Sequence, residues 1–222
     1  MHHSNFSLST RTKIEWSPGM GDHQRKGWIS PDGKNYYHMI AKNASSYLGG
    51  LLEDWKWVEV RSDIDINKAR SLCLIRDPRS RWISGITEFF SIIKVTPEEL
   101  ESNWPSFAKM LMYNPQQDAH TAPQVEFLHG LDLEKFDYGF VSEMFNIGEK
   151  LHIYFNNHGY PNEMFKFERQ NSVHHDPIKK QLNRFVHERL DEDVEFDQRI
   201  KYYYHSDYKL IEWIGRNKGW IG

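Results

Sequence analysis

One short stretch of the chain changes abruptly from apolar to charged: Leu72-Cys73-Leu74-Ile75-Arg76-Asp77-Pro78-Arg79-Ser80-Arg81. Residues 71–75 are apolar on both faces, which is typical of a central strand in a parallel sheet. Asp77 and Pro78 are typical of a helix start, with Asp as the N-cap and Pro at the first helical position. Apolar residues then recur at helical spacing over 82–93. The sequence therefore predicts a strand, a turn and a helix, with Arg76 at the end of the strand.

A second turn of the same kind lies upstream, between a predicted strand at 35–40 and a predicted helix at 44–55: Ala41-Lys42-Asn43-Ala44-Ser45-Ser46. Backbone N–H groups at such a turn bind anions, and Lys42 adds a full charge. In the first stretch, Arg76 and Ser84 lie around a similar helix N-terminus. Each turn taken alone also fits an ordinary capped helix with solvated basic residues. Together, two anion sites in one small domain favour a ligand that carries phosphates at both ends.

The rest of the chain alternates predicted strands with predicted helices. Strands are expected at 57–60, 136–141 and 164–167. Helices are expected at 97–113, 147–155, 178–190 and 196–214. Residues 1–33 are expected to form an irregular N-terminal arm, and 114–123 a polar loop. The pattern predicts one α/β domain over residues 1–222, with three layers in which helices flank a central parallel sheet.

Composition narrows the class of protein. The net charge of −3 over 222 residues disfavours nucleic acid as a partner. No apolar run approaches the roughly 20 residues of a membrane span, so no membrane partner is expected. The first residues lack the apolar stretch of a signal peptide. The single cysteine, Cys73, fits a reducing compartment, and a cytoplasmic location is the expectation.

The two turns resemble those of sulfotransferases that use 3′-phosphoadenosine 5′-phosphosulfate (PAPS). Residues 40–46 resemble the loop of that family that binds the 5′-phosphosulfate, with Ala41 where proline is usual. Residues 76–84 resemble its 3′-phosphate motif, and the interval of eight residues between Arg76 and Ser84 is kept. The resemblance implies a P-loop, nucleotide-kinase-like sulfotransferase fold, with PAPS as the donor and 3′-phosphoadenosine 5′-phosphate (PAP) as its product.

Other segments resemble the carbohydrate (Golgi-type) branch of the family. These are Asp118-Ala119-His120-Thr121-Ala122-Pro123-Gln124, the predicted strand at 136–141, Gln170-Asn171-Ser172, and Tyr204-His205-Ser206-Asp207-Tyr208. The resemblance spans residues 36–212 and is strongest at the two turns. It implies transfer of a sulfuryl group to a hydroxyl or amine of a small-molecule or glycan acceptor.

The resemblance also implies roles for individual residues. Lys42 would neutralise the charge that develops on the leaving phosphate. Arg76 and Ser84 would hold the 3′-phosphate, assisted by Arg81 unless Arg81 instead pairs with a surface acid such as Glu88. The 5′-phosphate would be held by Lys42 together with Asn43, Ala44, Ser45 and Ser46.

An acceptor hydroxyl needs a general base, for which His120 and Glu88 are the main candidates, ahead of Glu53 and Asp54 at the end of the first predicted helix. His120 lies in a polar loop, and histidine is the residue type whose unperturbed pKa lies near neutrality. Glu88 lies one helical turn beyond Ser84. No metal site is expected, because the histidine pairs lack the spacing of a zinc motif.

Two other classes of function stay open at this stage. One is a P-loop-like small-molecule kinase, which the absence of a Gly-x-x-x-x-Gly-Lys-[Ser/Thr] loop disfavours. The other is a non-catalytic nucleotide-binding protein of the same fold.

Overall fold

The computed structural model describes residues 26–60, 68–141, 144–159 and 176–221. Five strands form one open sheet in the order β3-β1-β2-β4-β5. Their bounds are β1 Gly27–Ile29, β2 Asn35–His38, β3 Val58–Val60, β4 Arg70–Arg76 and β5 Phe136–Val141. The strands predicted near 36, 58, 72 and 136 are confirmed, and β4 lies between β2 and β5 as expected of a central strand. The strand predicted at 164–167 falls outside the described residues.

The sheet is mixed: the parallel pairing that was expected is present at β4, but one edge of the sheet is antiparallel. β4 pairs in parallel with β2 and with β5, whereas β1 is antiparallel to β2 and to β3. β1 corrects the prediction that residues 1–33 are irregular throughout, because Gly27–Ile29 is a full member of the sheet. A three-residue strand carries almost no periodic signal. The Pro31-Asp32-Gly33 turn that leads into β2, with Gly33 at φ 72°, could have revealed the hairpin.

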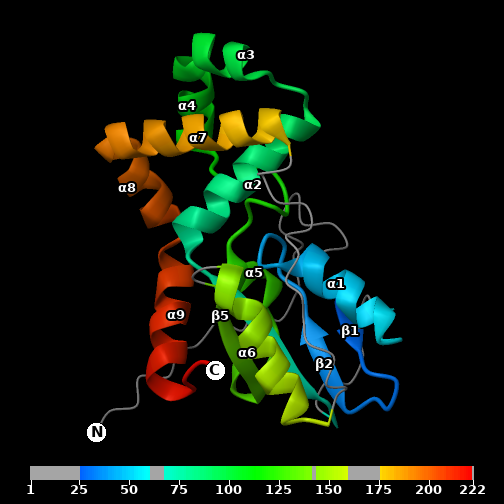
Figure 1. Cartoon of the computed structure of the whole chain (residues 1–222). Helices are drawn as coiled ribbons and strands as arrows, with labels where there is room; N and C mark the ends of the chain where they lie inside the picture. Colours follow the sequence, from blue (N-terminus) through cyan, green and yellow to red (C-terminus); the bar gives the residue numbers. More distant parts are fainter. Residues whose placement is uncertain (1–25, 61–67, 142–143, 160–175, 222) are drawn as a thin grey trace, which may run out of the picture.

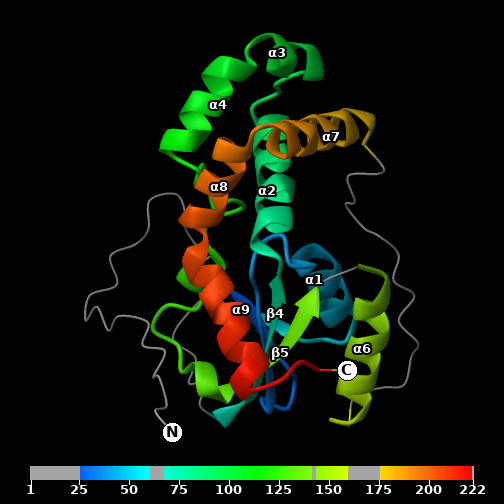
Figure 2. The same ribbon diagram turned by 90° about the vertical axis from the view of Figure 1, so that its left-hand side faces the viewer.

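Helices cover both faces of the sheet, so the three-layer arrangement is present (Figures 1 and 2). α1 (Ser45–Asp54) and α6 (Met144–Asn156) lie on one face, where Leu48 and Leu151 pack with Leu72 and Leu74. α5 (Gln124–Phe127) and α9 (His205–Asn217) lie on the other, where they pack against alternate β4 residues Cys73 and Ile75. The alternation of side chains along β4 explains why this strand is apolar on both faces.

A second group of helices stands at the end of the sheet where β4 runs into α2 (Figures 1 and 2). This helical head consists of α2 (Pro78–Ile92), α3 (Pro97–Ser102), α4 (Trp104–Tyr113), α7 (Pro177–Glu192) and α8 (Val194–Tyr203). Its core includes Trp82, Phe90, Val186 and Phe196. The start of α2 is as predicted: Asp77 is the N-cap, its carboxylate accepts a hydrogen bond from the Ser80 backbone N–H at 2.8 Å, and Pro78 follows.

The last predicted helix, 196–214, is in fact two helices that meet at Tyr204. Tyr204 leaves helical geometry, and its buried hydroxyl donates to the Thr121 carbonyl. α8 packs in the helical head, whereas α9 packs on the sheet. Helical periodicity continues through the break, so the sequence pattern did not mark it. None of the helices in the described residues is both long and apolar enough to cross a membrane.

His38 is a fully buried histidine that ties β2 to the residues following α5. Its Nε2 lies 2.9 Å from the Phe127 carbonyl oxygen, and its Nδ1 lies 3.0 Å from the Tyr36 hydroxyl. Since a carbonyl only accepts, the proton sits on Nε2 and Nδ1 accepts from Tyr36. This neutral ring satisfies both partners. Burial lowers the pKa of His38 to about 4, although the Phe127 carbonyl opposes the shift.

His38 therefore predicts an acid-sensitive fold. Unfolded His38 takes up a proton near its ordinary pKa, but folded His38 does so only near pH 4, so stability falls as the pH drops through this window. We expect the free energy of unfolding to fall by about 2 kcal/mol from this residue between about pH 7.5 and about pH 5. Urea unfolding of wild type and His38→Gln at both pH values measures it, since glutamine keeps both hydrogen bonds and does not titrate. An equal fall in the two proteins would contradict the assignment.

Candidate functional site

The two predicted anion-binding turns meet at one edge of the sheet. β2 and β4 are parallel neighbours, so the turns that follow them come out side by side. The Arg76 guanidinium, at the end of β4, donates to the Lys42 carbonyl oxygen at 3.2 Å. The amide of Asn43 reaches the carbonyl of Leu74 inside β4 at 2.7 Å. Lys42 and Arg76, which the sequence predicts to serve one site, thus lie side by side in the fold.

The turn at residues 41–46, called the Lys42 turn below, has an unusual backbone. Lys42 and Ala44 adopt positive φ values of 68° and 60°, in the left-handed region. Successive residues of alternating conformation direct their N–H groups into one concave surface, which is a common anion-binding arrangement. Ala44 is the N-cap of α1 and has no side-chain oxygen to bond the first N–H groups of the helix. The turn therefore lacks the side-chain cap of an ordinary capped helix, and Ser45 and Ser46 occupy the first turn of α1.

The Asn43 side chain points into the protein. It is fully buried, and its amide also donates to the Gln124 side-chain oxygen at 2.7 Å. Gln124 in turn bonds both the N–H and the carbonyl of Arg76, each at 2.9 Å. The Asn43 backbone N–H donates to the Ile40 carbonyl oxygen at 3.2 Å. Asn43 thus fixes the two turns relative to each other rather than presenting a donor to a ligand.

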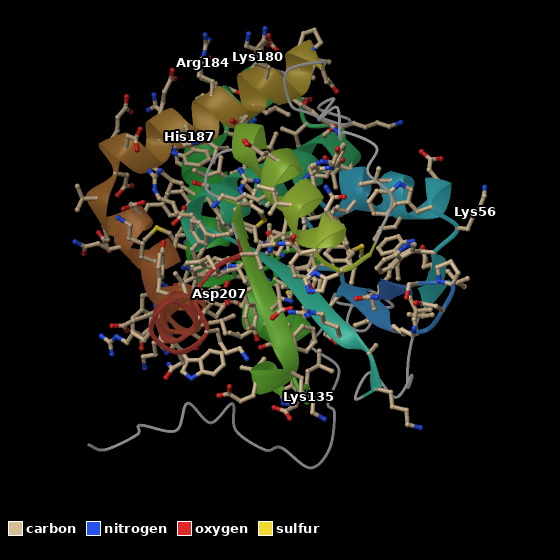
Figure 3. The ribbon with its side chains drawn as sticks, turned by 60° about the horizontal axis from the view of Figure 1, so that its bottom comes forward. Lys56, Lys135, Lys180, Arg184, His187 and Asp207 are labelled. Carbon is tan, nitrogen blue, oxygen red and sulfur yellow. The ribbon has the colours of Figure 1, made fainter. Side chains whose placement is uncertain are left out.

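Asp207 supports this assembly from α9 (Figure 3). Its carboxylate accepts from the backbone N–H groups of Gln124 at 2.8 Å and Val125 at 3.0 Å, and so caps α5. Burial raises the pKa of Asp207, against the opposing effect of these hydrogen bonds. The segments 118–124 and 204–208, singled out by resemblance, therefore contact each other behind the Lys42 turn.

Glu88 on α2 lies between two lysines. Its carboxylate is 3.3 Å from Lys42 Nζ and 2.9 and 3.0 Å from Lys179 Nζ on α7. Glu88 is therefore not the partner of Arg81. Burial would raise the pKa of Glu88, but the hydrogen bond from Lys179 and the charge of Lys42 hold it below its ordinary value. Glu88 is an ionised bridge between the Lys42 turn and the helical head.

The environment of Lys42 is cationic apart from Glu88. Burial lowers the pKa of Lys42, Glu88 opposes the shift, and the charges of Lys179 and Arg76 add to it. Burial and the nearby Arg81 likewise lower the pKa of Arg76. Desolvated cations that repel one another are stabilised by an added anion. The site is thus suited to an anionic ligand, although the chain as a whole carries a net charge of −3.

Arg81 has neither of the roles considered from the sequence. It is 1% exposed, and its guanidinium donates to three backbone carbonyls: Ala41 at 2.9 Å, Ala119 at 3.4 Å and Ala122. Its charge also lies over the Phe127 ring, at 5.4 Å from the centroid. Arg81 therefore joins the Lys42 turn to the loop that carries His120.

His120 lies in the loop at residues 114–123, called the His120 loop below, which packs on α2. Its Nδ1 and backbone N–H bond the two carboxylate oxygens of Asp118, at 2.9 and 2.8 Å. The loop approaches α2 at Gly85, where a Cβ atom would lie 2.3 Å from the His120 carbonyl oxygen. Ser84, the neighbour of Gly85, and Glu88, one turn further, lie on the same helix. α2 thus carries Ser84 and Glu88, packs against the His120 loop at Gly85, and contacts Lys42 through Glu88.

Sequence reasoning missed two residues of this site. Lys179 is remote in sequence, and only the crossing of α7 over α2 brings it to Glu88. Gly85 gave one usable signal, since a glycine inside a strongly apolar helix often marks a close approach.

Comparisons of the chain with protein families, with curated proteins and with solved structures gave no match. Among the described residues, no group of three or more His, Cys, Asp or Glu side chains is placed to hold a metal ion.

Gly85→Ala tests the contact between α2 and the His120 loop. We expect a loss of about 1–3 kcal/mol in the free energy of unfolding, because the new methyl overlaps backbone that cannot move aside. Gly215→Ala in α9 is the matched control, since its Cβ would meet only the Trp220 Nε1 atom at an ordinary 3.7 Å. The control should be neutral or gain up to about 1 kcal/mol from helix propensity. Urea unfolding of both variants measures this, and a Gly85→Ala protein as stable as the control would contradict it.

Arg81→Met tests the junction between the two loops. Methionine fills part of the same space but leaves three buried carbonyls without their donor. We expect a loss of about 3 kcal/mol or more in stability. Arg184→Met is the control, since Arg184 is exposed on α7 and should cost no more than about 0.5 kcal/mol. Equal stability of the two variants would show that Arg81 does not hold the loops together.

Proposed function

We propose that this protein is a PAPS-dependent sulfotransferase with a P-loop, nucleotide-kinase-like sulfotransferase fold. One observation carries the proposal: the Arg76 guanidinium bonds the carbonyl of Lys42, so that the two motifs expected to hold opposite ends of the donor adjoin at one edge of the sheet. Ligands of open α/β sheets bind outside the carboxyl ends of the strands, where these two turns lie. The left-handed turn before α1 and the resemblance of both motifs agree with it.

In the proposed mechanism the acceptor oxygen attacks the sulfur of PAPS. A new oxygen–sulfur bond forms as the bond from sulfur to the bridging phosphate oxygen breaks, and PAP leaves. Negative charge grows on that oxygen, where Lys42 would stabilise it. The N–H groups of Ala44, Ser45 and Ser46 would hold the 5′-phosphate, while Asn43 would position their turn. Arg76 with Ser84 would hold the 3′-phosphate.

The acceptor proton passes to a base, and the bonding partners of the two candidates favour His120 over Glu88. The Asp118 carboxylate accepts from Nδ1 of His120, which leaves Nε2 as the proton-accepting nitrogen of the neutral ring. Asp118 is ionised in this pair: burial would raise its pKa, but bonding to His120 lowers it overall. Glu88 is already paired with two lysines that lower its pKa, which makes it a weak base near neutral pH.

Two alternatives remain distinguishable by ligand. A small-molecule kinase of this fold would bind ATP with magnesium, and a non-catalytic protein would bind nucleotide without turnover. A sulfotransferase binds PAP without metal and transfers sulfate to a hydroxyl or amine. A glycan is the acceptor that the resemblance to the carbohydrate branch favours.

The proposal is tested with wild type, Lys42→Ala and the control Lys180→Ala, whose lysine is exposed on the outer side of α7 (Figure 3). Calorimetry should show PAP binding to wild type in the presence of a chelator. Transfer of labelled sulfate from PAPS to a panel of glycans, phenols and amines should fall at least about 100-fold in Lys42→Ala and stay unchanged in Lys180→Ala.

Each alternative gives a different result in the same assays. Tighter binding of ATP with magnesium than of PAP would favour a kinase. PAP binding with no transfer by any of the three proteins would favour the binding module. No PAP binding by wild type would overturn the proposal.

A further inference from the structure

α7 lies along α2 with one stripe of polar side chains, four residues apart, turned towards it. Lys179 bonds Glu88, Asn183 donates to the Thr87 hydroxyl at 3.2 Å, and Asp191 accepts from Arg79 at 2.6 Å. Residues further along α7 bond residues that come earlier in α2, so the two helices run antiparallel. The pairs leave one position of the stripe, 187, without a partner of its own on α2.

His187 occupies that position. On the antiparallel register set by Asn183 and Asp191, it lies opposite the turn of α2 that includes Ser80 and Ser84. It is half-buried, and Figure 3 shows it on the inner side of α7, whereas Lys180 and Arg184 point outwards. His187 also lies within electrostatic reach of Arg76. Arg76 and Ser84 are the two residues expected to bind the 3′-phosphate.

We propose that His187, in its protonated form, is a third ligand of the anion bound by Arg76 and Ser84. The inference rests on the proposed function and adds to it a ligand that the two motifs do not contain. It also explains how a single arginine and a serine can hold a dianion: α7 supplies a further charge once the helices are packed.

The charges around His187 set the sign of the pH dependence. Arg76 at the end of β4 and Arg79 on α2 disfavour its protonation, and Asp191 on α7 favours it. Arg79 is itself neutralised by Asp191 and by Asp197 of α8, and Arg184 and Glu188 on α7 pair with each other. Burial and the two arginines lower the pKa of His187 in the ligand-free protein. An anion placed beside it must raise that pKa, so binding takes up a proton and strengthens as the pH falls.

The experiment compares PAP with adenosine 5′-monophosphate, which lacks the 3′-phosphate, at about pH 6 and about pH 8. Wild type, His187→Asn and Arg184→Gln are titrated by calorimetry. We expect His187→Asn to bind PAP about tenfold more weakly than wild type at the lower pH and nearly equally at the higher. Comparison with wild type removes the titration of the phosphate itself. Adenosine 5′-monophosphate should bind both proteins alike, and Arg184→Gln should follow wild type.

A second measurement covers the case in which the variant does not fold. The pKa of His187 in wild type, followed by NMR, should rise by about one unit or more on saturation with PAP and stay constant with adenosine 5′-monophosphate. PAP binding with the same pH dependence in wild type and variant, or a pKa that PAP does not move, would overturn the role of His187 alone. Absence of PAP binding by wild type would overturn the proposed function and this role together.

Discussion

The buried guanidinium of Arg81 is the interaction on which the candidate site depends. This side chain bonds the backbone of both the Lys42 turn and the His120 loop. Its five N–H groups suit this task, because they can satisfy several carbonyls in one plane, whereas a lysine presents a single point charge. The surrounding carbonyls and the Phe127 ring replace the water that the charge loses on burial. Gln124 and Asp207 continue the same network behind the turns, so that β4, α5 and α9 hold the Lys42 turn and Arg76 in one arrangement.

The site in front of this network is built from cations that lack enough acidic partners. Glu88 is shared between Lys42 and Lys179, while the Arg76 guanidinium donates to the Lys42 carbonyl oxygen. Arg79, in contrast, is neutralised by two aspartates. Positive charge is therefore concentrated where β2 and β4 end, in a protein whose overall charge is negative. This local imbalance, with the left-handed turn before α1, makes this edge suitable for an anionic ligand. The negative charge of the chain as a whole disfavours nonspecific binding of polyanions elsewhere.

Much of the fold could be predicted because its elements carry local signals. β4 is apolar on both faces, and Asp77 and Pro78 mark the start of α2 whatever surrounds them. β1 could not be predicted in this way, since three residues become a strand only by pairing with β2 and β3. The break at Tyr204 was equally hidden, because the apolar period continues while α8 and α9 pack on different surfaces. For the site, the sequence marked Lys42, Arg76 and His120 as candidates. It misjudged Arg81, whose burial depends on two loops that are distant in the chain.

The sequence by itself determined the strand-to-helix turns, since a few adjacent residues fix each one: small residues and Lys42 in the first, Asp77 and Pro78 in the second. Only the tertiary structure decided what these turns contact. The antiparallel packing of α7 on α2 brings Lys179 to Glu88 and His187 opposite Ser84, and the parallel pairing of β2 with β4 brings Arg76 to Lys42. The reason is the distance along the chain over which each kind of interaction acts. Caps and turns depend on hydrogen bonds within a few residues, whereas the partner of a charged side chain depends on which helix or strand the whole core places beside it.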